Sequence, residues 1–390
     1  MLGFLALAAS LYSLYLGLQF DRKASGALGR TQQGFRPRVC LIMACKGEEP
    51  GLEGNLGAVL DQDYANYHTA IVVDSAEDAA YPVAKSVLSR HSDGDSHIYI
   101  SDPVASASGK VAALLTALER DWGQAQVYAF VDSDALVTPS WLGNLVDPLG
   151  DESVGATTGF RWLFPSRGGF WSYAESAWNA SGTNLLFNDR YNFPWGGAMA
   201  VRAETLDKIG IQRIWPTAIS DDLTLNAALR KHDYRIMFLP QCSVATFNQT
   251  DRHKFLEWAA RQTALTRAYN SGLWNYAAGA YAFFDLVFLL GAISLVFGVA
   301  VAPLWLLPSA LLLTPSLLGV LRSTQRTSTF SRAMPQFKEE FRRAKFKEAI
   351  ASLIVPWVMT YCIINSARTS EIEWRGRIYK LTEMNPLASP

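Results

Sequence analysis

Charge is scarce in this sequence, and neither sign is in excess. Of 390 residues, 35 are Lys or Arg and 35 are Asp or Glu, so that 18% of the chain is charged. A balanced chain has no general basic field that would favour binding to nucleic acid. Apolar residues make up 49% of the chain and aromatic residues 12%, which excludes an intrinsically disordered protein.

Several common site motifs are missing. The four cysteines form no CxxC pair, and the five histidines form no HxxxH or HExxH pattern. A disulfide framework and a zinc site are therefore not expected. No GxGxxG is present either, which removes the main support for a dinucleotide-binding protein.

Apolar residues gather at the two ends of the chain. Residues 2–20 carry no charge and are long enough to cross a bilayer, and the first basic residues follow them. Because no basic residue precedes this run, we expect an uncleaved anchor rather than a signal peptide. Residues 280–321, interrupted by three prolines, fit a helical hairpin. The shorter run 349–366 fits a third crossing, a re-entrant helix or a buried core helix.

These patterns divide the chain into six expected segments. They are an N-terminal transmembrane anchor (1–21), a catalytic domain (35–276), a transmembrane hairpin (280–322), a basic cytoplasmic loop (323–348), a transmembrane or re-entrant helix (349–366) and a tail (367–390). The positive-inside rule places the catalytic domain in the cytoplasm. We therefore expect an integral membrane protein, surrounded by membrane lipids, in a bacterial inner membrane.

Between the apolar ends, strand-like runs alternate with segments of helical spacing. The expected strands are 39–43, 69–73, 97–100 and 127–131, and the expected helices include 52–60, 83–88 and 109–118. This alternation predicts an α/β fold with a mostly parallel sheet. Ligands of such sheets bind beyond the carboxyl ends of the strands, where Asp74, Asp132 and Asp134 fall.

Several short motifs stand in the order and spacing found in family 2 glycosyltransferases. They are the opening segment 37–75, Gly109-Lys110, Asp132-Ser133-Asp134, the glycine-rich segment 196–202, and Ser220-Asp221-Asp222. Together they resemble that family over about residues 37–275. The resemblance implies a GT-A fold, a Rossmann-like α/β domain that transfers a sugar from a nucleotide donor.

The flanking segments narrow the resemblance. The N-terminal anchor, the apolar segments after the catalytic domain and the tail 372–379 (IEWRGRIY) resemble family 21, the ceramide glucosyltransferases and their bacterial relatives. This implies inverting transfer of glucose from UDP-glucose to a lipid hydroxyl such as that of ceramide. The family's (Q/R)xxRW element is absent, and the residues in its place are Arg261, Gln262 and Arg267. The resemblance assigns them to the donor, with a snorkelling interfacial role as the alternative for Arg267.

Carboxylates are the expected ligands of the donor and its metal. A leaving diphosphate needs a divalent cation, and carboxylate oxygens suit Mn²⁺ or Mg²⁺. In an extended Asp-Ser-Asp both acidic side chains point to one face, so we assign Asp134 to the metal and Asp132 to the metal or the nucleotide. Helix capping is the alternative. The resemblance places Asp74 on the uracil imide, with a turn-forming role before Ser75 as the alternative. Lys110 either neutralises a phosphate or begins a helix.

The remaining acidic pair supplies the expected base. Inversion needs a group that removes the acceptor proton on the face opposite the leaving diphosphate. Asp221 and Asp222 precede a helical pattern, where carboxylates are favoured, and neighbouring acids raise each other's pKa. The resemblance gives the role of base to Asp222. A simple capping cluster is the alternative.

Other functions remain open at this point. A polysaccharide synthase of the same superfamily is opposed by the missing QxxRW and by too few crossings, and a polyprenyl-phosphate glycosyltransferase by the N-terminal anchor. A membrane scaffold with a decayed site is opposed by the complete set of aspartates. The aromatic segment 168–193 fits either an interfacial platform for a lipid acceptor or ordinary core packing.

Overall fold

A computed structural model describes residues 1–91 and 95–381, and the chain separates into two compact units. Unit 1 contains residues 1–26, 164–184 and 249–373, and unit 2 contains 27–163, 185–248 and the tail from 374. This division differs from the expected catalytic domain 35–276, because its segments 164–184 and 249–276 pack with the apolar helices of unit 1. The last nine residues of the expected tail lie outside the described residues.

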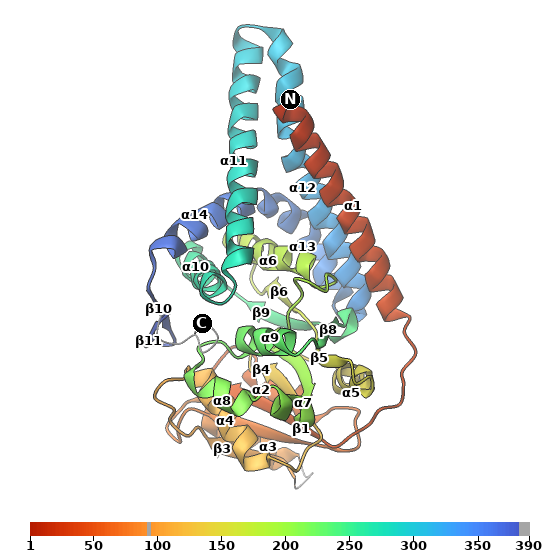
Figure 1. The fold of residues 1–390 in the computed structure, drawn as a ribbon, viewed down its shortest axis with the longest axis vertical. Coiled ribbons are helices and arrows are strands. Elements are labelled where there is room, and N and C mark those ends of the chain that lie inside the picture. Colours follow the sequence, from red (N-terminus) through yellow and green to blue (C-terminus); the bar gives the residue numbers. More distant parts are fainter. Residues whose placement is uncertain (92–94, 382–390) are drawn as a thin grey trace. The chain divides into compact units, whose positions relative to one another are not determined.

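A seven-stranded sheet forms the centre of unit 2 (Figure 1). In spatial order its strands are β3 (His97–Ile100), β2 (Tyr67–Val73), β1 (Val39–Cys45), β4 (Val127–Asp132), β7 (Ala198–Arg202), β5 (Val154–Thr158) and β8 (Arg235–Phe238). The first four strands are parallel, β7 runs antiparallel between β4 and β5, and β5 pairs in parallel with β8. The expected α/β fold with a mostly parallel sheet is confirmed.

The central strands are apolar along nearly their whole length because helices cover both faces of the sheet. One face packs against α2 (Leu52–Leu60), α3 (Ala80–Arg90) and α5 (Trp141–Val146). The other face packs against α4 (Gly109–Asp121), α7 (Ala203–Lys208), α8 (Ile211–Ile214) and α9 (Asp221–Lys231). A separate two-stranded sheet consists of β6 (Arg161–Pro165) and β9 (Val244–Asn248), and Val244 packs in the first of these cores.

Two helices begin at serine caps, and these caps position the charged residues of their first turns. Ser108 Oγ accepts a hydrogen bond from Val111 N at the start of α4, and Ser220 Oγ accepts one from Leu223 N at the start of α9. Such a cap stabilises a helix by about 1 kcal/mol. It fixes Lys110 and the Asp221–Asp222 pair at the first turns of their helices.

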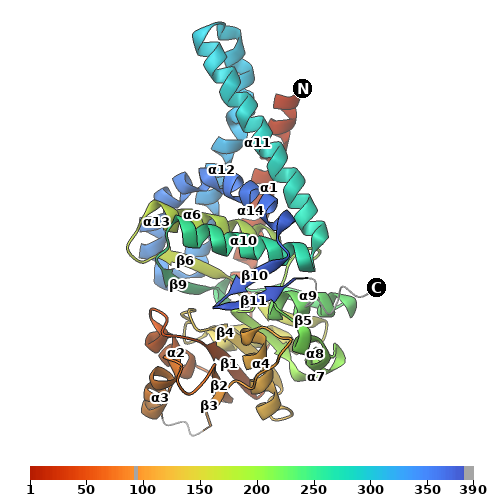
Figure 2. The ribbon, with the colours of Figure 1, turned by 90° about the vertical axis from the view of Figure 1, so that its left-hand side faces the viewer.

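Unit 1 is helical. Its helices are α1 (Leu2–Leu28), α6 (Phe170–Ser181), α10 (Arg252–Tyr269), α11 (Ser271–Ala300), α12 (Leu306–Ala333), α13 (Lys338–Ala351) and α14 (Val355–Arg368). The long helices α11 and α12 lie side by side as the expected hairpin (Figures 1 and 2). The tail then forms the strands β10 (Glu371–Trp374) and β11 (Arg377–Lys380).

The expected basic loop, 323–348, is mostly helical. It contains the end of α12 and most of α13. Glu339 forms ion pairs with Arg342 and Arg343, three and four residues on, which is the spacing of neighbours on a helix surface. Phe341 and Ala344 are buried on the other face of α13. Much of the segment expected between the apolar runs is therefore an amphipathic helix.

Aromatic side chains of the 168–193 segment pack mainly inside the protein. In unit 1, Trp171 lies 6.5 Å from Phe255 and Trp178 lies 5.0 Å from Trp258, measured between ring centres, so α6 packs against α10 (Figure 2). Phe170, at 49% exposure, is the most exposed ring of α6. Core packing thus accounts for most of the rings on this helix.

Four stretches of the described chain are long and apolar enough to cross a membrane. They are Leu2–Leu28, Ser271–Ala300, Pro303–Ala333 and Pro335–Arg368. Large apolar side chains on α11 stay exposed, for example Ile293 at 64% and Val299 at 76%. This exposure suits contact with lipid and is consistent with a membrane protein.

We expect the full-length protein to stay in the membrane pellet after an alkaline carbonate wash. Carbonate removes proteins that are held by surface charge, whereas apolar helices of this length are held by the bilayer core. Sedimentation followed by immunoblotting measures the retained fraction. Quantitative release into the supernatant would contradict the assignment of membrane-spanning helices.

Candidate active site

The charged residues singled out in the sequence of unit 2 gather at one end of its sheet. Asp132 is the last residue of β4, Asp134 follows two residues later, and Asp74 comes directly after β2. Asp221 and Asp222 begin α9. Parallel neighbours end at the same edge, so the chain brings these carboxylates together there.

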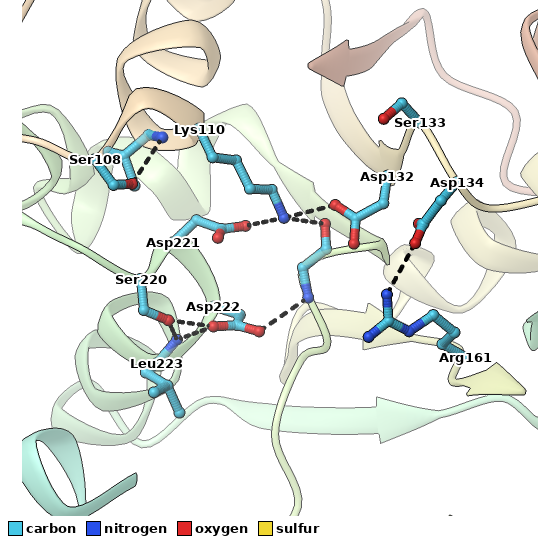
Figure 3. A network of polar contacts seen from close by, with 12 residues as sticks. Ser108, Lys110, Asp132, Ser133, Asp134, Arg161, Ser220, Asp221, Asp222 and Leu223 are labelled. Carbon is cyan, nitrogen blue, oxygen red and sulfur yellow. Dashed lines mark hydrogen bonds and ion pairs between the residues drawn. The ribbon is translucent and has the colours of Figure 1, made fainter. Parts of the chain in front are cut away.

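Lys110 lies at the centre of this group. Its Nζ atom is 2.7 Å from Asp132 Oδ1 and 3.2 Å from Asp221 Oδ2, and it donates to the carbonyl oxygen of Gly196 at 3.4 Å (Figure 3). Burial opposes the charge on the amine, but Asp132, Asp221 and Asp222 outweigh it and raise the pKa of Lys110. The lysine therefore does more than begin a helix, since it joins β4 to α9.

Asp221 and Asp222 have different environments although they are adjacent. Asp221 is buried at 3% exposure and faces Lys110. Its pKa rises to about 6, first because of burial, which Lys110 opposes and Asp222 and Asp132 reinforce. The expected effect of one acid on the other is present at Asp221, with burial as the larger cause.

Asp222 is half-buried and accepts hydrogen bonds at both oxygens. Oδ1 accepts from the Ser220 hydroxyl and from Leu223 N at 2.8 Å, and Oδ2 accepts from Gly196 N at 3.3 Å (Figure 3). Of the two acids, Asp222 is the more open to solvent and makes no ion pair in the described chain. These are properties that a general base needs.

The glycine pair before β7 allows the backbone to pass between these acids. A Cβ atom at Gly196 would collide with Asp221 Oδ2, and one at Gly197 would collide with Asp132 Oδ2 and the ring of Trp195. Only glycine permits such close approach without shifting the carboxylates. The glycine-rich segment is therefore part of the site's framework.

Asp132 and Asp134 fit a divalent cation. Asp134 Oδ2 is 3.1 Å from Arg161 Nη1, while Asp134 Oδ1 is buried and accepts no hydrogen bond from the described residues. Burial raises the pKa of Asp134 despite Arg161. At Asp132 burial is outweighed by Lys110 and Arg161, which lower its pKa. A buried carboxylate oxygen without a donor beside a second carboxylate matches the hard oxygen ligands of Mn²⁺ or Mg²⁺.

Asp74 lies among cations that the sequence did not assign to a site. Its carboxylate is 3.1 Å from Lys46 Nζ and 3.2 Å from Arg377 Nη2. Glu49 accepts from the Ser133 hydroxyl at 2.7 Å. Lys46 and Glu49 belong to a polar turn that is visible in the sequence. In contrast, no local sequence pattern predicts that Arg377 of the tail lies beside Asp74.

The residues that stand in place of (Q/R)xxRW lie on α10 in unit 1. The Arg267 guanidinium donates to the backbone oxygen of Ala367 at 3.0 Å and to that of Thr369. It thereby satisfies carbonyl groups at the end of α14, a common role for arginine. Donor contacts of Arg261, Gln262 and Arg267 remain a prediction.

A second cluster, of Cys40, His68 and Asp121, is buried elsewhere in unit 2. The three possible ligand atoms lie within 4.8 Å of one another. However, His68 Nε2 and Asp121 Oδ1 are 2.6 Å apart, a hydrogen-bond distance. Two ligands of one tetrahedral ion with bonds of about 2.0 Å lie roughly 3.3 Å apart. The cluster as folded is thus a hydrogen-bonded pair that ties the end of α4 to β2.

The sequence of this chain matches a known family over nearly its whole length. A model of glycosyl transferase family 21 aligns with residues 1–386. The chain belongs to this family. It is therefore a glycosyltransferase, and the α/β unit just described is its GT-A domain.

Solved structures show more distant likeness to this family 21 chain. The mannosyltransferase PcManGT from Pyrobaculum calidifontis, solved with GDP-Man and Mn²⁺, is 19% identical with a TM-score of 0.47, over 93% of this chain and 99% of that chain. GalNAc-T7, solved with UDP, GalNAc and Mn²⁺, is 13% identical with a TM-score of 0.40, over 55% of this chain and 44% of that chain. At these scores the donor or acceptor of this protein cannot be inferred from either structure.

Proposed function

We propose that this family 21 glycosyltransferase moves a sugar, glucose from UDP-glucose, to the hydroxyl of a membrane lipid such as ceramide, with inversion at the anomeric carbon. The observation that carries the proposal is the division of acids at the sheet edge. Asp132 and Asp221 form ion pairs with Lys110, whereas Asp222 accepts a hydrogen bond from the backbone N–H of Gly196. The acids paired with Lys110 are suited to the donor side of the site, and Asp222 is suited to the acceptor.

On the donor side, each proposed role follows from chemical type. Asp74 accepts a hydrogen bond from the uracil imide, and Asp132 and Asp134 hold Mn²⁺ or Mg²⁺. The bound ion supplies positive charge that stabilises the leaving diphosphate. Lys110 adds a half-buried positive charge beside Asp132, 2.7 Å from its carboxylate. Arg261, Gln262 and Arg267 are the proposed contacts from α10.

On the acceptor side, Asp222 is the proposed general base. Its carboxylate takes the proton from the lipid hydroxyl as that oxygen bonds to the anomeric carbon. The bond between the anomeric carbon and the diphosphate oxygen breaks with its electron pair, and UDP leaves. Backbone groups at Gly196 and Leu223 donate to Asp222 and hold it in place.

The proposed acceptor is a lipid because of the helices in unit 1. Four stretches of the described chain can cross a bilayer, which would keep the enzyme at the surface where a lipid hydroxyl is available. Basic residues after the first apolar run support a cytoplasmic catalytic domain in the bacterial inner membrane. UDP-sugars are soluble and would reach it from that side.

The test is a donor panel. Membranes that contain the protein are incubated with labelled UDP-sugars and Mn²⁺, and the lipids are extracted and weighed by mass spectrometry. We expect a lipid that gains one hexose when UDP-glucose is supplied, at a rate about 10²–10⁴ lower in membranes that carry Asp222→Asn. Label found only in water-soluble polymer, or a nucleotide-sugar panel with no transfer at all, would contradict the proposal.

A further inference from the structure

The tail folds back as a hairpin whose turn and second strand belong to unit 2 (Figure 2). Arg375 and Gly376 form its two-residue turn with φ angles of 51° and 75°. Two consecutive positive φ angles are typical of a type I′ turn, whose twist suits a tight hairpin. Arg375 adopts this conformation although it has a side chain, so the backbone here is held by its surroundings.

The hairpin is anchored where the parallel strands end. The Tyr379 hydroxyl accepts a hydrogen bond from Gly109 N at 3.3 Å, and Tyr379 is buried at 6% exposure. Arg375 donates to the carbonyl oxygen of Lys46 at 2.6 Å and pairs with Glu49. These contacts hold the tail against the start of α4 and the turn after β1.

Arg377 pairs with Asp74, the carboxylate that the uracil of the donor would need. Its Nη2 atom lies 3.2 Å from Asp74 Oδ1 and 3.4 Å from Oδ2. It also packs on Gly109, where a Cβ atom would lie 2.9 Å from its Nη1. If a uracil imide binds Asp74, Arg377 must therefore pair with another anion.

The diphosphate is the anion that would arrive with the base. Glu49, the partner of Arg375, accepts from the Ser133 hydroxyl of Asp-Ser-Asp, so both arginines face the proposed donor site. Their side chains are about half exposed, at 45% and 48%, so a ligand in solution can reach them. A guanidinium fork matches phosphate oxygens in geometry and charge.

We propose that the β10–β11 hairpin is a donor-binding element. When a nucleoside diphosphate binds, Arg377 and Arg375 exchange Asp74 and Glu49 for phosphate oxygens. Asp74 Oδ1 then becomes available to the uracil, while Lys46 stays paired with Oδ2. The inference rests on the proposed function and adds two specificity-determining residues to the same site.

The test compares a nucleotide with its nucleoside. Full-length protein in nanodiscs is titrated with UDP by calorimetry and with uridine by ligand-observed NMR, both with Mn²⁺ present. Arg377→Ala should weaken UDP binding about 10- to 100-fold, the worth of a hydrogen bond between charged groups, while uridine binds as well or better. Arg377→Lys should recover part of the loss. Lys380→Ala removes the same charge from the same strand and should leave both affinities unchanged.

Turnover and binding of the Arg377→Ala variant together support or overturn the inference. In turnover assays the donor KM of Arg377→Ala should rise more than kcat falls. For Arg377→Ala, unchanged UDP affinity or an equal loss for UDP and uridine would overturn the inference. Tighter UDP binding would overturn it too, because Arg377 would then block the donor site. If wild-type protein binds no UDP, the proposed function itself fails. If it binds UDP but Arg377→Ala binds equally well, only the role of the hairpin fails.

Discussion

Replacement of Asp222 by Asn is expected to lower the rate of sugar transfer by about 10²–10⁴, the usual contribution of a general base. Asn keeps the size of the side chain, and its oxygen can still accept from Ser220 and Leu223, whose donors meet Asp222 Oδ1. The amide of Asp222→Asn, however, is not basic enough to remove the proton from the lipid hydroxyl. Single-turnover transfer from labelled UDP-glucose measures the loss, and a melting curve checks that the fold survives.

Asp221→Asn is the matched control. Asp221 is buried against Lys110, which retains its shorter contact with Asp132 after the substitution. We therefore expect a milder loss than for Asp222→Asn. If Asp221→Asn is the inactive variant and Asp222→Asn keeps wild-type turnover, the assignment within the pair is wrong. If neither slows transfer, the inverting mechanism has no base in this pair.

Removal of divalent metal is expected to abolish transfer. Without a cation, the donor diphosphate would approach Asp132 and the buried Asp134 oxygen directly, and like charges repel at short range. Activity should disappear in EDTA and return when Mn²⁺ or Mg²⁺ is added in excess. Asp134→Asn should raise the Mn²⁺ concentration that gives half-maximal activity.

The control for the metal experiment is an acid outside the site. Asp151 pairs with Arg235 at the surface of unit 2, and Asp151→Asn should not change the Mn²⁺ requirement. Full turnover of the wild-type enzyme in chelator would contradict the assignment of Asp132 and Asp134. So would an Asp134→Asn variant that needs no more Mn²⁺ than wild type.

Local sequence predicts the centre of the sheet well. Strands β1, β2 and β4 are continuous apolar runs because both of their faces are covered, and this pattern is visible without any partner. Asp74 and Asp132 stand at the ends of such runs, so their place at one edge follows from the parallel topology. The caps Ser108 and Ser220 likewise fix where α4 and α9 begin.

Long-range partners are what the sequence does not reveal. Arg377 and Asp74 are 303 residues apart, and nothing around either residue specifies the other. Strand β7 is short and follows two glycines, so it looks like a loop until it pairs with β4 and β5. In helix α13 the buried residues alternate with charged ones, so its buried face is hard to recognise in the sequence. In each case the decisive interaction is tertiary.

Calorimetric titration of UDP in the presence of Mn²⁺, on wild-type protein and on the Asp134→Asn and Asp222→Asn variants, tests the division of the site most directly. If Asp134 holds the donor through the metal and Asp222 serves only the acceptor, Asp222→Asn should bind UDP within a few-fold of wild type. Asp134→Asn should lose most of its affinity. Equal loss in both variants, or a loss confined to Asp222→Asn, would contradict the separation of donor and acceptor acids.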